Sequence, residues 1–426
     1  MSYQPPTLLT LPVELRLPIY RILLNKYNPH NTKTFLNISL VCHQIRDEIL
    51  PLIFHDSIYF HSPEKLSKWT SRGDPRLLKL VYNISLHVFE EALVKLRESL
   101  AESNEDPTED FQSTKDWLTI RKASQVEIPA SNPVGLTSFC RTMWSRSSKI
   151  IRDNTRSFHQ TKDTMREKDA VTAAWDSFRA ISNVRKIWIL FRTSNTGSDR
   201  NSNLLEKEQQ LFLNMIPAAC PNVQEFTFFS ISNLLPLSFL AHFQDLRLLR
   251  FSGYSKSSPR ETLSILKSLN NLETIIIYRY PETYPKDNAI DTSSVHSYLS
   301  FAPEVLENLQ PLKSIHFSHM TSRIPSDHIT LPMIHALRPH AESLRSLRIF
   351  TDFAVDGDVL LALLDFVATT KLKHLCLSMR IPRRFEKLDV QKYLPSTLSR
   401  KEVKLANPRG PNPGDLLEFG VNNFTI

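Results

Sequence analysis

Glycine is scarce in this chain, with only eight residues among 426. Nucleotide-binding folds and α/β-hydrolases rely on clustered glycines, because their backbone must approach a phosphate group or turn sharply at a nucleophile. The glycines here lie far apart except near the C-terminus, where the spacing of Gly410 and Gly414 does not fit a phosphate-binding loop and no lysine follows. The scarcity of glycine therefore argues against both enzyme classes.

Cysteine is also sparse, and no two cysteines have the close spacing of a zinc site or a redox motif. The four residues are Cys42, Cys140, Cys220 and Cys376, which are too dispersed to supply the two zinc sites of a RING domain. We therefore expect reduced thiols in a reducing compartment, with no metal and no cofactor.

Long hydrophobic runs are missing as well. The longest purely apolar stretches span about five residues, as in Ile187–Phe191, whereas a helix needs about 20 to cross a bilayer. The first ten residues lack the charged start and apolar core of a signal peptide. These features predict a protein of the cytoplasm, the nucleus or both, without a membrane partner.

Positive charge is only weakly in excess, since 52 Lys and Arg residues accompany 44 Asp and Glu residues, for a net charge of +8. The basic residues near the C-terminus, from Arg380 to Lys404, are interleaved with Glu386, Asp389 and Glu402. Such dilution is typical of a solvated segment and argues against a track that binds nucleic acid.

Catalytic motifs are also missing. The chain has neither a Gly-x-Ser-x-Gly elbow nor a His-Glu-x-x-His pair, and its fourteen histidines are scattered. We predict that the protein is not an enzyme. The remaining alternative is a catalytic triad assembled from residues that lie far apart in the sequence.

The N-terminus contains two apolar stripes with helical spacing. The first spans residues 11–23 and includes Pro18, which predicts a kink or an early 3₁₀ turn. The second spans residues 35–49, after a polar break, and is expected to end or bend at Pro51. The two stripes predict a pair of amphipathic helices.

The segments LPVELRLPIYRILL and ISLVCHQIRDEILPLIF together resemble the F-box of fungal F-box proteins. The matching positions are Leu11, Pro12, Glu14, Leu15, Ile19, Leu40, Val41, Cys42, Ile45 and Glu48. The resemblance implies that these helices dock onto a Skp-type adaptor and, through it, a cullin. The implied adaptor-binding residues are Leu11, Pro12, Leu15, Ile19 and Val41. The alternative is a helical hairpin that only caps a larger core.

Seven copies of the pattern apolar-x-x-apolar-x-apolar follow in the second half of the chain. They are Val184-Ile187-Ile189, Val223-Phe226-Phe228, Leu246-Leu249-Phe251, Leu272-Ile275-Ile277, Leu312-Ile315-Phe317, Leu344-Leu347-Ile349 and Leu372-Leu375-Leu377. The alternation in each copy predicts a strand with one inward face, and the pattern resembles the strand half of a leucine-rich repeat. The copies start 23 to 40 residues apart, so we expect an irregular, leucine-rich-repeat-like solenoid.

Helix-like segments lie between most copies, as such a repeat requires. Residues 204–219 have helical apolar spacing, Ser258 and Glu261 have the spacing of a capping box, and Asp358 is placed to cap residues 359–368. This alternation predicts an α/β fold with a parallel sheet. The expected organisation is an F-box at 1–60, a helical connector with one outlying strand repeat and a flexible acidic loop at 61–180, and the solenoid with a C-terminal cap at 181–426.

The residues between and just after the apolar anchors point to the opposite face of the predicted sheet, which is the concave binding surface of a solenoid. Aromatic and arginine side chains often anchor interfaces. The candidate substrate-binding residues are therefore Trp188, Phe229, Arg250, Tyr278, His316, Arg348 and Phe350. The alternative is that helices or the C-terminal tail cover this face and make it core.

The resemblance implies a non-catalytic substrate-recognition subunit of an SCF-type cullin–RING ubiquitin ligase. Its F-box would bind the adaptor, and its solenoid would bind an unknown protein substrate. The alternative is a protein-interaction scaffold with a vestigial F-box and no role in ubiquitin transfer, which the proline at position 18 favours.

Overall fold

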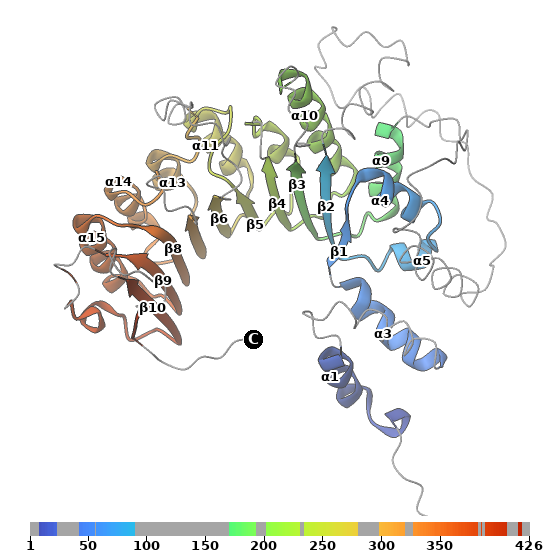
Figure 1. Cartoon of the computed structure of the whole chain (residues 1–426), viewed down its shortest axis with the longest axis horizontal. Helices are drawn as coiled ribbons and strands as arrows, with labels where there is room; N and C mark the ends of the chain where they lie inside the picture. Colours follow the sequence, from blue (N-terminus) through green and yellow to red (C-terminus); the bar gives the residue numbers. More distant parts are fainter. Residues whose placement is uncertain are drawn as a thin grey trace, which may run out of the picture. The chain divides into compact units, whose positions relative to one another are not determined.

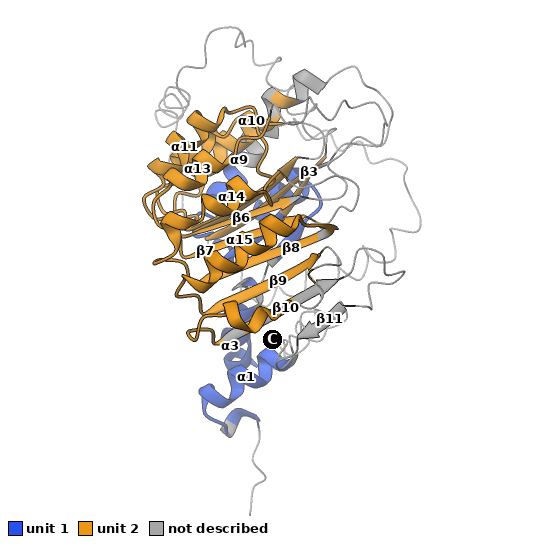
Figure 2. Ribbon diagram, turned by 90° about the vertical axis from the view of Figure 1, so that its left-hand side faces the viewer, with its two compact units in different colours: residues 1–85, 95–184 blue, residues 86–94, 185–426 orange. Residues whose placement is uncertain are grey.

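The structure is a computed structural model of the chain (Figure 1). It describes residues 8–23, 42–55, 57–89, 170–192, 202–230, 234–279, 298–319, 327–381, 385, 388–406 and 416–419. The strands of these residues form one sheet, in which the spatial order follows the chain from β1 to β11. The chain divides into two compact units, residues 1–85 with 95–184 (unit 1) and residues 86–94 with 185–426 (unit 2), which Figure 2 colours separately.

Unit 1 consists mainly of helices in the residues described. They are η1 (Leu8–Thr10), α1 (Val13–Leu23), α3 (His43–His55), α4 (Pro63–Thr70), α5 (Pro75–Leu78) and α9 (Ala170–Ala180), accompanied by β1 (Ser57–Phe60) and the first residues of β2 (Asn83–Phe89). A polar N-cap followed by proline starts both α4 and α5: Ser62 Oγ accepts from the Lys65 amide at 3.3 Å and Asp74 Oδ1 from the Arg76 amide at 2.8 Å.

Neither proline in the N-terminal helices ends its helix. Helix α1 continues through Pro18 to Leu23, and α3 continues through Pro51 to His55. The alternative in which Pro51 ends the second helix is therefore wrong. Burial on both sides of the proline explains this, because Ile49 and Phe54 are 0% and 7% exposed and their packing offsets the one backbone hydrogen bond that proline removes.

Unit 2 is an alternation of strands and helices. Its strands are β3 (Lys186–Arg192), β4 (Glu225–Ser230), β5 (Leu248–Phe251), β6 (Thr274–Arg279), β7 (Ser314–His319), β8 (Ser346–Ala354), β9 (His374–Arg380), β10 (Arg400–Ala406) and β11 (Leu416–Phe419). Between them lie α10 (Ser202–Ala219), η3 (Ser238–His242), α11 (Pro259–Ser268), α13 (Pro303–Asn308), α14 (Leu331–His335), η5 (Arg338–His340), α15 (Gly357–Ala368) and η7 (Val390–Tyr393). Strands β3 to β10 pair in parallel, so the predicted α/β class with a parallel sheet is confirmed.

The apolar triplets form the core of unit 2. All seven lie in or directly before β3 to β9, and strand pairing places their second and third residues in two continuous rows. The first row is Ile187, Phe226, Leu249, Ile275, Ile315, Leu347 and Leu375, and the second is Ile189, Phe228, Phe251, Ile277, Phe317, Ile349 and Leu377; each side chain is at most 6% exposed. Helices α10, α11, α13, α14 and α15 lie on one face of this sheet (Figures 1 and 2).

A backbone ladder connects the starts of successive strands. The carbonyl of the residue before one strand accepts from two amides at the start of the next, as Arg247 O does from Glu273 N and Thr274 N, both at 2.9 Å. The carbonyls of Arg185, Lys313 and Arg345 each accept two such hydrogen bonds as well. Backbone groups therefore connect the strand starts, and single side chains add bonds in the turns, as Asn271 Nδ2 donates to the Gln244 carbonyl at 3.2 Å.

The predicted helices form, with one difference at a cap. Residues 204–219 lie in α10, and Ser258 Oγ accepts from the Glu261 amide at 3.2 Å at the start of α11. The predicted cap at Asp358 is wrong, since α15 begins at Gly357 and Asp356 occupies the N-cap position. Asp358 lies in the first turn, where its charge is favourable near the positive end of the helix.

Strand β10 was not predicted from the sequence. It pairs in parallel with β9, and β11 pairs antiparallel with β10. The register places Lys401 opposite Leu375 and Val403 opposite Leu377. A charged residue therefore occupies one of the three apolar positions, which is why the pattern did not indicate a strand.

Candidate functional site

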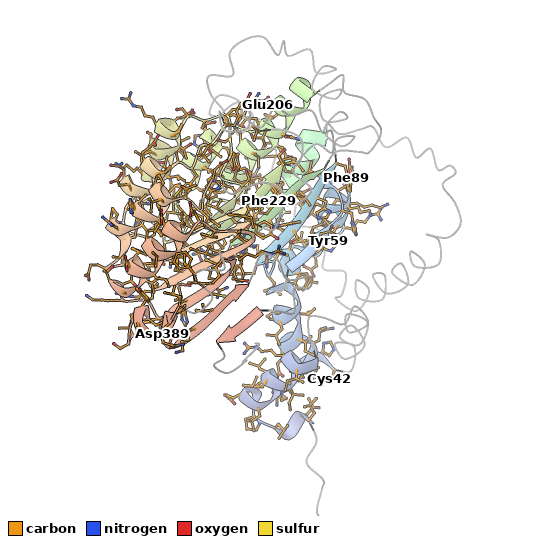
Figure 3. All side chains as sticks on the ribbon, turned by 60° about the vertical axis from the view of Figure 1, so that its left-hand side comes forward. Cys42, Tyr59, Phe89, Glu206, Phe229 and Asp389 are labelled. Carbon is orange, nitrogen blue, oxygen red and sulfur yellow. The ribbon has the colours of Figure 1, made fainter. Side chains whose placement is uncertain are left out.

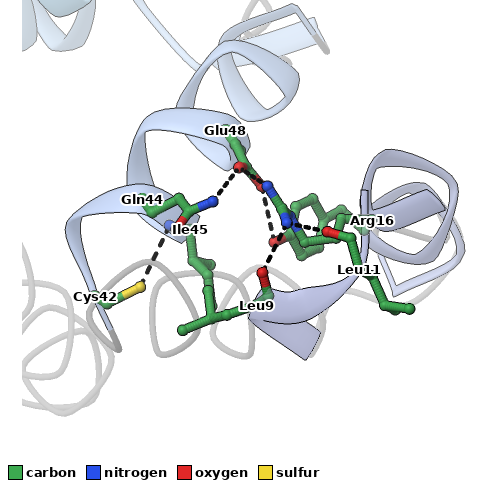
Figure 4. Close-up of polar contacts among 8 residues, drawn as sticks. Leu9, Leu11, Arg16, Cys42, Gln44, Ile45 and Glu48 are labelled. Atoms are coloured by element: carbon green, nitrogen blue, oxygen red, sulfur yellow. Dashed lines mark hydrogen bonds and ion pairs between the residues drawn. The ribbon is translucent and has the colours of Figure 1, made fainter. Parts of the chain in front are cut away.

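Helix α1 is attached to α3 by a polar network beside a small apolar cluster that includes Leu17. Arg16 donates from Nε to Glu48 Oε2 at 2.9 Å and from Nη2 to Glu48 Oε1 (Figure 4). The Tyr20 hydroxyl donates to the same carboxylate at 3.1 Å. Arg16 and Tyr20 are 5% and 0% exposed, and Tyr20 packs with Ile45 and Ile49. Arginine and tyrosine thus occupy the buried side of α1.

The Arg16 guanidinium also forms hydrogen bonds with the segment that precedes α1. It donates to the carbonyl oxygens of Leu9 and Leu11 (Figure 4). Hydrogen bonding to Arg16 lowers the pKa of Glu48, and hydrogen bonding to Glu48 raises the pKa of Arg16, so both groups stay charged at neutral pH. This network fixes α1 in rotation about its own axis.

Several apolar side chains on the other side of α1 face solvent. Leu15 and Ile22 are 55% and 75% exposed, Pro12 is exposed, and Ile19 is partly exposed. Residues 15, 19 and 22 are spaced by four and three positions, so they share one face of the helix. We call this surface, together with Leu11 and Pro12, the apolar face of α1. Four of the five predicted adaptor-binding residues lie in it, and the fifth, Val41, lies outside the described residues.

The seven predicted substrate-binding residues lie on the sheet face opposite the helices, in two rows that strand pairing creates. The first row is Trp188, Thr227, Arg250, Ile276, His316, Arg348 and Cys376. The second row has two parts. Leu190 pairs with Phe229 in one part, and the other consists of Tyr278, Ser318, Phe350 and Ser378. We call this surface the opposite face.

Burial divides these residues into accessible and buried positions. Arg348 is exposed, and Trp188, Arg250, Tyr278, His316 and Phe350 are half-buried. Phe229, which Figure 3 labels among the strands of unit 2, is only 2% exposed and lies 5.7 Å from the ring of Tyr278. Phe229 therefore packs beside Tyr278 on the same face and does not meet solvent itself.

His316 lies at the centre of the charged part of the opposite face. It pairs across the sheet with Arg348, and its ring meets the ring of Phe350 edge-on at 5.4 Å. Its Nε2 atom is buried without a hydrogen-bond partner in the described part of the chain. Burial, and then the positive charges of Arg348 and Arg250, lower the pKa of His316 to about 4, so its imidazole is neutral at pH 7.

The lowered pKa of His316 predicts how acid affects stability. An unfolded histidine has a pKa of about 6.5, so between pH 6.5 and about 4 the unfolded state binds a proton that the folded state does not. The free energy of unfolding should therefore fall as the pH decreases through this window. Above pH 6.5, His316 should contribute no pH dependence to it. Urea unfolding at pH 7 and pH 5 should show a smaller difference for His316→Gln than for the wild type.

Two other histidines define the control for this experiment. Burial also lowers the pKa of His340, whose Nδ1 accepts from the Leu312 amide at 3.2 Å while Nε2 donates to the Leu306 carbonyl at 2.8 Å. The His316→Gln variant should therefore keep the part of the pH dependence that comes from His340. Replacing the exposed His242 with glutamine should leave that dependence unchanged. An unaltered pH dependence in the His316 variant would contradict the assignment.

The sequence did not predict a groove of about 650 Å³ between α14, η5 and α15. Its walls carry Asp358 and Asp365 together with His335 and Arg338. The groove forms where helices of successive strand–helix units meet, and local sequence patterns contain no signal for such a meeting. The groove thus carries side chains of both signs, two carboxylates and one guanidinium.

Comparison with known proteins adds no relative. No protein-family model matches the chain, and no curated protein matches it significantly. Within the described residues, no helix is long and apolar enough to cross a membrane. The same residues contain no cluster of three or more His, Cys, Asp or Glu side chains placed to hold a metal ion.

Proposed function

We propose that this protein is the substrate-recognition subunit of an SCF-type cullin–RING ubiquitin ligase. In this proposal, the N-terminal helices form an F-box that binds a Skp-type adaptor, and the opposite face of the sheet binds a protein substrate. The single observation that supports it most is the exposure of the apolar face of α1, together with the F-box-like sequence of the same segment.

The exposed and buried sides of α1 differ from those of a surface helix that packs only within its own unit. A surface helix normally buries its apolar stripe and exposes its charged residues, whereas α1 buries Arg16 and exposes Leu15 and Ile22. Exposed apolar patches mark interaction surfaces, because water contact with them is unfavourable. We therefore assign Leu11, Pro12, Leu15 and Ile19 to the adaptor interface, and Val41 joins them through the F-box resemblance alone.

The second half of the proposal concerns substrate. The parallel sheet presents a surface with Trp188, Tyr278, Phe350 and two arginines at exposed or half-buried positions, which are the residue types that most often anchor interfaces. A receptor of this kind does no bond chemistry. It raises the effective concentration of its bound substrate beside the ubiquitin-charged conjugating enzyme.

Adaptor binding by the full chain tests the proposal. We expect the purified protein to bind a Skp-type adaptor saturably, and Leu15→Ala to weaken that binding about 10-fold, because burying a leucine side chain contributes about 1.5–3 kcal/mol and 1.4 kcal/mol corresponds to a factor of ten. Leu15→Asp should abolish binding, since it would place an unpaired charge in an apolar interface. Isothermal titration calorimetry measures both effects.

A second exposed leucine serves as the matched control. Leu331 is 37% exposed at the start of α14 in unit 2, so Leu331→Asp should leave adaptor binding at the wild-type level. A folded protein that does not bind the adaptor would support the alternative, a protein-interaction scaffold with a vestigial F-box. Circular dichroism of each variant establishes that it is folded.

A further inference from the structure

The middle of the opposite face carries positive charge and no negative charge. We call the positions of β5 to β9 on this face, as far as the register shift that follows Phe350 in β8, the central strip. They are Leu248, Arg250, Thr274, Ile276, Tyr278, Ser314, His316, Ser318, Ser346, Arg348, Phe350, His374, Cys376 and Ser378. These positions include two arginines and two histidines but no acidic residue, and Asp352 follows at the register shift in β8. The charges of the strip itself favour a ligand with negative charge.

Arg250 and Arg348 both act electrostatically on His316. Both lower the pKa of His316 by their charge. Arg348 lies on the strand next to His316, and Arg250 lies two strands away on the other side. Since neighbouring strands are about 4.8 Å apart, the backbones of Arg250 and Arg348 are separated by about 14 Å. The positive charge thus extends across several strands with a neutral histidine in between.

The side chains around these cations suit a peptide chain. Phe350 packs against His316 at 5.4 Å, and Tyr278 is half-buried on the strand between His316 and Arg250. The Nε2 atom of His316 is buried and lacks a hydrogen-bond partner among the residues described. The rings and guanidinium groups of the strip together offer both packing and hydrogen bonds.

We infer that the central strip binds an acidic segment of the protein substrate, whose carboxylates pair with Arg250 and Arg348 on either side of His316. An extended chain rises about 3.4 Å per residue, so acidic residues four positions apart span the same distance of about 14 Å. Guanidinium groups bind carboxylates with two parallel hydrogen bonds. Nucleic acid fits less well, because its binding sites usually neutralise many phosphates and this strip has only two permanent positive charges.

This inference rests on the proposed role of the opposite face in binding substrate, but its test does not need the adaptor. The probe is a fluorescein-labelled dodecapeptide with aspartate or glutamate at every fourth position and serine or glycine elsewhere. We expect the full-length protein to bind it, to bind the asparagine and glutamine version at least tenfold more weakly, and to lose affinity with rising salt concentration. Fluorescence anisotropy measures all three properties.

Matched charge reversals locate the site. Arg348→Glu should reduce peptide affinity at least tenfold, whereas Arg338→Glu, at an exposed arginine in η5, should change it less than twofold. Equal effects of the two variants, equal binding of the neutral peptide, or no peptide binding by the folded protein would overturn the inference. Tighter binding of a single-stranded oligonucleotide with the same dependence on Arg348 would also overturn it in favour of nucleic acid. Peptide binding by a protein that fails to bind the adaptor would support the site and contradict only the ligase role.

Discussion

Replacing Phe226 with alanine is expected to lower the free energy of unfolding by about 3–5 kcal/mol, the usual cost of removing a fully buried aromatic ring. Phe226 is 0% exposed and lies in the first core row. Its ring is 4.9 Å from that of Phe243 and 5.8 Å from those of Phe228 and Phe239. Removal would leave a cavity between β4 and η3 that these rigid rings cannot fill. Urea unfolding followed by circular dichroism measures the loss.

The matched control lies on the other side of the same sheet. Phe350 is half-buried on the opposite face, so Phe350→Ala removes less buried area and should produce a clearly smaller loss of stability. The pair of variants also tests which face of the sheet is core. A loss at position 350 equal to or greater than that at position 226 would contradict the assignment of the two faces.

Replacing Gly253 with alanine is the second change with a large expected effect. Gly253 has φ = +84°, and a Cβ atom there would overlap the imidazole of His328 and lie 3.0 Å from Ile277 Cγ2. The positive φ costs a non-glycine residue about 1–2 kcal/mol, and forcing extra volume into a packed site costs about 1–3 kcal/mol more. We therefore expect the free energy of unfolding to fall by about 2–5 kcal/mol.

Neither partner of this contact can move easily. The Gly253 carbonyl accepts from the amides of Ser300 and Phe301 at 3.2 and 3.0 Å, which holds the backbone in place. The His328 ring is 3% exposed and stacks on Phe317 with ring centroids 6.5 Å apart. The strain therefore cannot be relieved by a small shift of a flexible side chain.

Two further variants separate the contributions at this site. In a His328→Ala background the overlap is gone, so Gly253→Ala should cost only the about 1–2 kcal/mol of the backbone conformation. Chemical denaturation of the four proteins measures these values, and an undiminished cost in the His328→Ala background would contradict the overlap.

The strands of unit 2 were predictable because each carries its own signal. Alternation of apolar and polar residues has a period of two in any half-buried strand, and this holds for copies such as Leu249 and Phe251 wherever they lie in the chain. Strand β10 lacked the signal, since Lys401 occupies an apolar position, and the segment pairs in parallel with β9 through its backbone. Strand β10 thus forms by pairing with β9, although its sequence lacks the apolar alternation of the other strands.

The two candidate surfaces were predictable to different extents. The strand period alone assigned Arg250, His316 and Arg348 to one face, and the register then aligned them into a row. The network of Arg16, Tyr20 and Glu48 was not predicted, although Arg16 and Tyr20 have the four-residue spacing of one helix face. Its third member is 28 residues away from Tyr20, and a contact over that distance leaves no periodic trace.

The sequence by itself determined the α/β class, the positions of seven strands and the composition of each sheet face, because these depend on periodicities of two and 3.6 residues within short segments. Only the tertiary structure decided which side of α1 is buried, how Phe229 came to pack beside Tyr278, and how two arginines came to act on one histidine. The physical reason is that burial and charge interaction depend on distances between segments, and those distances are established when the chain packs.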